Sequence, residues 1–187
     1  RTGDPADPGG SAHNLNASAT ASFAHPPTLS KVLLGTNQSF TSGNDVAIGE
    51  TAQYQVTITV PEGVSPASYL ADQLPDGLAI ASIDQLTASP SLTTSIGSFN
   101  AVLQNALVEN NGRLLTFDFG TLTNPLVNGP AQTITVVYTA VVLNVSSNQS
   151  GTTLTNDATF QSDTQDVETS APALTVVTPR LRVRSEE

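Results

Sequence analysis

Apolar and polar residues alternate with a period of two along most of the chain. The clearest case is the segment 48–60, whose apolar face holds Ile48, Ala52, Tyr54, Val56, Ile58 and Val60. The opposite face of this segment carries Thr and Gln side chains, and Pro61, Glu62 and Gly63 follow as a turn. A period of two with many Val, Ile and Thr residues is typical of half-buried strands. We therefore predict an all-β fold.

Further strands are predicted where the same alternation returns between turn residues. They cover 68–74, 78–83, 114–119, 133–145, 153–161 and 173–178. About eight strands separated by turn signals favour a β-sandwich over other architectures. The segment 84–111 is ambiguous, because its apolar residues fit either a short helix or another pair of strands.

The two ends of the chain carry a separate signal. In 14–23 every odd position is apolar and every even position is polar, which predicts a strand without a local hairpin partner. Residues 179–183 resemble 27–31, as expected where units follow one another head to tail. We therefore predict an N-terminal arm (1–26), a sandwich (27–179) and a tail or start of a next unit (180–187). The alternation in the arm also fits a flexible tail in which it arises by chance.

Composition limits the classes of partner. The chain has 187 residues and a net charge of −10, from 16 acidic and six basic residues, and four of the basic residues are Arg1, Arg180, Arg182 and Arg184. No basic stripe exists to neutralise phosphates, which argues against nucleic acid. Only 12% of the residues are charged, and Cys is absent, so disulfides and thiol chemistry are excluded.

The expected location is extracellular, at a cell surface. No apolar run approaches the roughly 18 residues of a membrane-spanning helix. The sequence begins at Arg1, as a processed secretory product or an excised fragment would. We expect no cofactor and no metal, since His13 and His25 have no third ligand nearby.

Three polar residues occupy apolar strand faces. Lys31, the only lysine, shares the parity of Leu29 and Leu33, while Asp72 and Asn156 interrupt two other apolar faces. Because strand side chains alternate between faces, each of the three is predicted to point into the core.

Burial gives these three residues a specific chemistry. A buried lysine tends to lose its proton and a buried carboxyl tends to keep one. If Asn156 lies beside them, the neutral Lys31 amine can attack its amide carbon while Asp72 moves protons, releasing ammonia and leaving an isopeptide bond. In a second interpretation Lys31 extends to the end of the sandwich and forms an ion pair with Asp72 or Glu50.

Six segments in order resemble a known family. The segments 29–31, 48–54, 71–78, 117–120, 135–140 and 155–160 are similar to the fimbrial isopeptide-formation domains of Gram-positive pilins and to related conserved repeats of bacterial surface proteins. The resemblance implies an Ig-like β-sandwich in which Lys31 joins Asn156 with Asp72 as the catalytic acid. Glu50, which also has apolar parity, is the reserve candidate for the acid.

These observations predict a structural protein with no enzymatic turnover. We expect a unit of an extracellular filament, pilus or adhesin stalk that assembles head to tail with copies of itself, with strand donation from 14–23. The alternative function is an adhesin domain that binds a host protein or glycan through its loops, above all those within 84–111.

Overall fold

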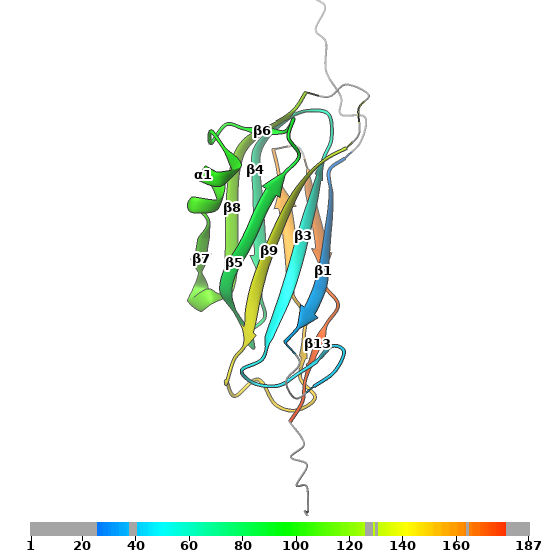
Figure 1. Ribbon diagram of the computed structural model, residues 1–187, viewed down its shortest axis with the longest axis vertical. Coiled ribbons are helices and arrows are strands. Elements are labelled where there is room, and N and C mark those ends of the chain that lie inside the picture. The colour runs from blue at the N-terminus through cyan, green and yellow to red at the C-terminus, as the bar shows by residue number, and fades with distance from the viewer. Residues whose placement is uncertain (1–25, 38–40, 126–128, 130, 164, 179–187) are drawn as a thin grey trace, which may run out of the picture.

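The alternating segments pair into two antiparallel sheets that pack face to face as a β-sandwich in the computed structural model (Figure 1). The structure describes residues 26–37, 41–125, 129, 131–163 and 165–178. The predicted all-β, Ig-like sandwich is therefore confirmed, while the predicted strand in 14–23 and the tail 180–187 lie outside the described residues.

The first sheet has four strands in the order β1-β3-β9-β5. Their bounds are Thr28–Thr36 for β1, Thr51–Val60 for β3, Gln132–Val142 for β9 and Leu78–Ala88 for β5. The β3–β9 register runs without a shift, with Tyr54 directly opposite Tyr138. Every second residue of β3 and β9 is buried, as the alternation predicts.

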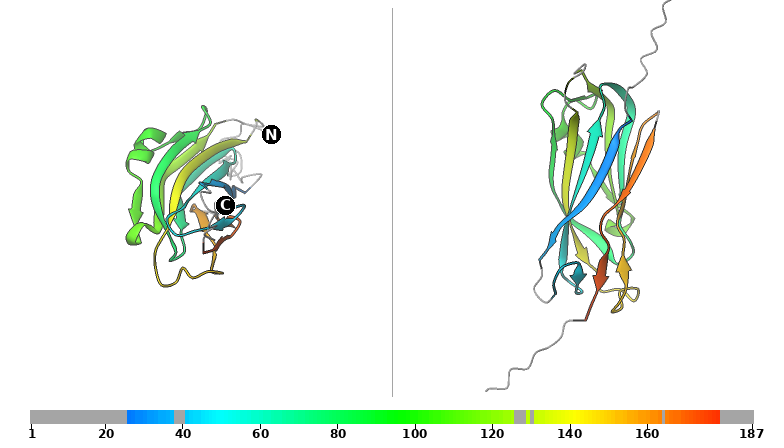
Figure 2. Two further views of the ribbon diagram at one scale, coloured as in Figure 1. Left: turned by 60° about the horizontal axis from the view of Figure 1, so that its bottom comes forward. Right: turned by 90° about the vertical axis from the view of Figure 1, so that its right-hand side faces the viewer.

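The second sheet has the order β12-β11-β4-β8-β6, and β7 also pairs with β8. Its strands are β12 (Asp166–Ser170), β11 (Asp157–Gln161), β4 (Gly63–Gln73), β8 (Leu114–Asn124), β6 (Thr93–Thr94) and β7 (Leu107–Glu109). A small third sheet contains β10 (Thr153–Leu154), β13 (Leu174–Val176) and β2 (Asp45–Val46). Figure 2 shows β1 running beside the strands near the C-terminus along one side of the sandwich, where β1 contacts β12.

The ambiguous segment 84–111 contains both kinds of structure. Strand β5 continues to Ala88, a single short helix α1 spans Phe99–Gln104, and β7 follows. Ser98 caps the helix, because its hydroxyl accepts a hydrogen bond from the Ala101 backbone N–H. The 3₁₀ turn η1 (Asn110–Gly112) then leads into β8.

The core lies between the two main sheets. Its largest fully buried side chains include Tyr54, Tyr138, Phe117, Phe119 and Phe160. They come from both sheets, so each layer covers the apolar face of the other. Three polar residues of the candidate site are also buried here: Lys31, Asp72 and Asn156.

Several predicted strands are wrong in their bounds, and the errors at 48–50 and at 155–156 affect candidate site residues. The strand expected from 48 begins at Thr51, and Ile48 is 46% exposed. A turn closes here instead, because the Glu50 N–H donates to the Ala47 carbonyl and Gly49 adopts a positive φ of 89°. The strand expected over 153–161 is interrupted, since Thr155 and Asn156 separate β10 from β11.

Strand β12 was missed by the alternation. Asp166 and Glu168 lie on this edge strand with exposed side chains. Its only large apolar residue is Val167, which is too little to produce a recognisable apolar face. Pairing with β11, which the sequence pattern does not reveal, extends the backbone here.

In the described part of the chain, no helix is both long and apolar enough to cross a membrane. The first described residue, Pro26, and the last, Thr178, lie at opposite ends of the long axis of the sandwich (Figure 1).

Gly77 provides a test of the packing at the lower end of the sandwich. A Cβ at this position would lie against Asn148, whose buried Nδ2 donates 2.8 Å hydrogen bonds to the Gly77 and Leu143 carbonyls. We expect Gly77→Ala to lower the free energy of unfolding by about 2 kcal/mol, since both bonds must be disturbed. Urea denaturation followed by circular dichroism measures this loss.

Gly35→Ala is the matched control, because no atom lies within 4 Å of a Cβ there. This substitution should leave the midpoint of urea denaturation almost unchanged. Equal effects of the two substitutions would contradict the proposed role of Asn148.

Candidate functional site

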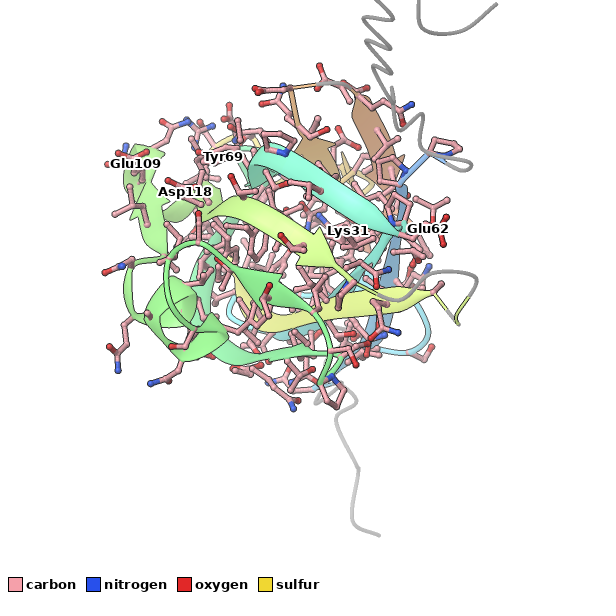
Figure 3. All side chains as sticks on the ribbon, turned by 90° about the horizontal axis from the view of Figure 1, so that it is seen from above. Lys31, Glu62, Tyr69, Glu109 and Asp118 are labelled. Carbon is pink, nitrogen blue, oxygen red and sulfur yellow. The ribbon has the colours of Figure 1, made fainter. Side chains whose placement is uncertain are left out.

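The Lys31 side chain enters the core from the edge of the first sheet. Lys31 pairs in register with Val56 of β3 and is 4% exposed, while the residues on either side of it in β1 are exposed. Seen from above in Figure 3, Lys31 lies among the side chains inside the sandwich, whereas Glu62 and Glu109 lie at its periphery. Its Nζ lies 5.6 Å and 5.8 Å from the ring centroids of Tyr54 and Tyr138. Both rings therefore offer the cation a favourable π face.

Asp72 faces Lys31 from the opposite sheet. It lies on β4, paired with Leu115 on one side and Ala158 on the other, and is fully buried. The Lys31 Nζ donates a hydrogen bond of 2.6 Å to Asp72 Oδ1. This contact joins the two layers of the sandwich through an ion pair with almost no exposed side-chain surface.

Asn156 occupies the short break between β10 and β11. It lies two residues before Ala158, the β11 partner of Asp72, and is 1% exposed. Its backbone carbonyl accepts a 3.0 Å hydrogen bond from the Ala171 N–H, which fixes the chain at this point. The Asn156 amide is therefore presented on the same inner face as Asp72.

Tyr138 links the acid to the amide. Its hydroxyl donates to Asp72 Oδ2 at 2.9 Å and accepts from Asn156 Nδ2 at 2.7 Å. Together with the Lys31–Asp72 contact, these bonds form a continuous buried chain in the order Lys31, Asp72, Tyr138, Asn156.

Burial shifts the pKa of each of these groups in the direction that favours its neutral form. Desolvation lowers the pKa of Lys31, although the neighbouring Asp72 opposes this shift. Desolvation raises the pKa of Asp72 against the opposing effect of Lys31, and burial also raises the pKa of Tyr138. Burial therefore lowers the cost of moving a proton from the ammonium to the carboxylate, the step that produces a neutral amine beside a neutral acid.

Glu50 lies away from this chain of hydrogen bonds. It lies immediately before β3 and six positions before Val56, the partner of Lys31, which corresponds to about 20 Å along the strand. Its Oε2 instead accepts from the Ala47 N–H at 2.9 Å and from Thr41 Oγ1 at 2.7 Å. Glu50 therefore holds the turn before β3, and the geometry gives no support to its reserve role as the acid.

Sequence reasoning assigned no role to Tyr138. Its parity with Val136 and Ala140 predicts an inward side chain, and a buried tyrosine hydroxyl normally finds a hydrogen-bond partner. That signal indicates a polar neighbour but cannot identify it, because Asp72 and Asn156 come from the other sheet and its edge.

Comparisons with known proteins give the fold a precedent. The sequence matches no protein-family model and no curated protein. Among solved structures, the pilus backbone protein RrgB from Streptococcus pneumoniae is similar with a TM-score of 0.50 and 14% identity, over 74% of this chain and 31% of that one. A structure named BspA_C_WT is similar with a TM-score of 0.52 and 16% identity, over 81% of this chain and 50% of that one.

These similarities concern the fold. The chain spans about a third of RrgB and half of the second structure. At such low identity they show that the sandwich has a pilin-like fold, and they carry no information about individual site residues.

The buried ion pair can be tested without the proposed bond, in an Asn156→Ala background. There we expect Lys31→Met to lower the free energy of unfolding by about 3 kcal/mol, because Asp72 remains buried without its cation. Adding Asp72→Leu should recover most of this loss, since no charged group is then buried. Urea denaturation at neutral pH measures both effects.

Val32→Met in the same background is the control, because Val32 is the next residue of β1 and is 43% exposed. It should change stability little. A double variant as unstable as Lys31→Met alone would show that the unpaired acid is not the cause.

Proposed function

We propose that this chain is a structural unit of an extracellular filament, pilus or adhesin stalk, stabilised by an isopeptide bond between Lys31 and Asn156. The observation that carries the proposal is the buried chain of hydrogen bonds from Lys31 through Asp72 and Tyr138 to Asn156. A lysine, a carboxyl group and an amide rarely meet in a core without a reason, because burying them is costly.

The reaction needs only these side chains. The Lys31 ammonium gives a proton to Asp72, and the neutral amine attacks the Asn156 Cγ. The Nζ–Cγ bond forms, the Cγ–Nδ2 bond breaks, and Nδ2 leaves as ammonia with one proton that came from Nζ. Asp72 ends as the neutral acid that it was before the attack, so the step needs no cofactor.

Burial of the three side chains, which keeps bulk water away from them, favours this reaction. Lys31, Asp72 and Asn156 are each at most 4% exposed, so few water molecules compete to solvate the amine or to hydrolyse the amide. The product joins residues 125 positions apart and closes most of the sandwich into one covalent loop. In a chain without Cys, such a bond supplies the crosslink that disulfides provide elsewhere.

End-to-end assembly is supported by the position of the chain ends. The described chain enters at one end of the long axis and leaves at the other (Figures 1 and 2). Copies joined through these ends would form a linear array. We propose that residues 14–23 of one copy pair with a strand of the next, because their alternation is that of an unpartnered strand.

Binding of a host protein or glycan is the second candidate. Leu107 and Val108 on β7 are 55% and 45% exposed, within the segment 84–111 that the sequence suggests for binding. An exposed apolar pair of this kind favours a protein contact over a sugar site.

The bond is tested by intact-mass measurement of the purified full chain. We expect a mass lower than the calculated value by one ammonia, and the full calculated mass for Lys31→Ala and for Asn156→Ala. Loss of the long covalent loop should also lower the stability of both variants by about 5 kcal/mol. Full mass in the unsubstituted chain would falsify the crosslink.

Assembly is tested with paired substitutions in the arm. Leu15→Asp with Phe23→Asp places charges on its apolar face, while Asn16→Asp with Ser22→Asp places the same charges on its polar face. We expect the first pair to abolish multimers in light scattering and the second to retain them, because only the apolar face is needed against a neighbour. Equal behaviour of the two pairs would argue against strand donation.

A further inference from the structure

The Tyr138 hydroxyl lies between the acid and the atom that must leave. Its oxygen is 2.9 Å from Asp72 Oδ2 and 2.7 Å from Asn156 Nδ2, the nitrogen that becomes ammonia in the proposed crosslink. Asp72 meets Lys31 through the other oxygen, Oδ1, at 2.6 Å. The two oxygens of one carboxyl group thus face the attacking amine and, through Tyr138, the leaving amine.

We propose that Tyr138 is a catalytic residue of the crosslinking reaction, whose hydroxyl passes a proton from Asp72 to the departing Asn156 nitrogen. This inference rests on the proposed Lys31–Asn156 bond and adds a residue to the Lys31, Asp72 and Asn156 set.

The leaving nitrogen requires such a donor. An amide nitrogen leaves as an anion only at very high energy, so it must gain a proton as the Cγ–Nδ2 bond breaks. Once the amine has added to Cγ, Nδ2 is no longer conjugated with the carbonyl and its lone pair can accept a proton. The group already at hydrogen-bond distance from Nδ2 is the Tyr138 hydroxyl.

The proton balance closes around Asp72. Asp72 receives the ammonium proton on Oδ1, so its carboxyl group turns about Cβ–Cγ to bring the protonated oxygen to Tyr138. In the intermediate this oxygen gives its proton to the Tyr138 oxygen, while the Tyr138 hydroxyl gives its own proton to Nδ2. The Nζ, positively charged after attack, gives one proton to the other Asp72 oxygen. Ammonia leaves, and Tyr138 and Asp72 regain their starting states.

Water is poorly placed to replace Tyr138. Tyr138 and Asp72 are fully buried, and Asn156 is 1% exposed. The Tyr138 ring is also fixed, since β9 lies between two neighbours and the ring packs 5.6 Å from that of Tyr54. The relay is therefore preorganised within the fold.

Tyr54 supplies a matched comparison within the same pair of rings. It lies directly opposite Tyr138 on β3 and is equally buried, and its hydroxyl is near the Asn156 amide. Among the described residues, however, no group meets the Tyr54 hydroxyl with hydrogen-bond geometry. Removing the Tyr54 hydroxyl therefore deletes a buried tyrosine hydroxyl beside Tyr138 but leaves the proposed proton path from Asp72 to Asn156 in place.

The experiment follows crosslinking over time in the full chain. Protein is made in a reconstituted translation system, synthesis is stopped, and samples quenched in acid are measured by intact mass for the loss of ammonia. We expect Tyr138→Phe to slow the loss about 100-fold, the lower end of the usual effect of a general acid. Tyr54→Phe should react at about the rate of the unsubstituted chain, and Asp72→Asn should not react.

A second measurement tells whether Tyr138→Phe impairs folding rather than the reaction. The melting temperature of Tyr138→Phe is measured in a Lys31→Ala background, where no bond forms. A slow reaction with an unchanged melting temperature supports the relay. If melting falls sharply, 3,5-difluorotyrosine placed at position 138 replaces the phenylalanine variant. A change in rate of about threefold or more, as expected when the acidity of a proton donor changes, then supports the relay, and an unchanged rate overturns it.

The other outcomes distinguish the two proposals. Crosslinking of a folded Tyr138→Phe at the unsubstituted rate overturns the role of Tyr138 and leaves the bond intact. Failure of the unsubstituted chain to lose ammonia overturns the bond itself.

Discussion

The cost of removing charge from water governs this structure. Lys31 and Asp72 are buried in the centre of a sandwich with few charged residues, and desolvation moves the pKa of each toward its neutral form. In other proteins, a buried ion pair often contributes little to stability or reduces it. In the proposed crosslinking reaction, the same desolvation prepares the Lys31 amine as nucleophile and Asp72 as proton donor, 2.6 Å apart. The penalty of burial would then drive the chemistry.

The register of the strands determines where the buried polar side chains lie relative to one another. The unshifted β3–β9 ladder sets Tyr138 opposite Tyr54, and the two strands beside β4 hold Asp72 in place. Asn156 reaches the same inner face because the chain breaks between β10 and β11, which frees it from the ladder while its carbonyl is held by Ala171. The pilin-like fold supplies the two layers, and the residues at their centre are those of the proposed crosslink.

The sequence was sufficient for the parts of the structure that depend on alternation. The all-β class, the long strands and the burial of Lys31, Asp72 and Asn156 follow from which face each side chain occupies. The prediction that Ile48 lies on the buried face of a strand was wrong, because the hydrogen bonds of a turn override the alternation there. Strand β12 was missed because Val167 alone makes no apolar face. The position of Tyr138 between Asp72 and Asn156 depends on how two strands and the segment before β11, all distant in sequence, come together. No local pattern encodes that arrangement.

The position of Asn156 also determines how the unit would respond to tension. With the Lys31–Asn156 bond in place, force applied between Pro26 and Thr178 passes from residue 31 directly to residue 156 and bypasses the strands between them. The 22 residues from 157 to 178, including β11, β12 and β13, connect the bond to the pulled end and so still carry the load. They could be drawn out by about 70 Å while the rest of the core stays folded. Each unit would then combine an inextensible body with one extensible segment that absorbs a sudden pull and refolds when the load is released.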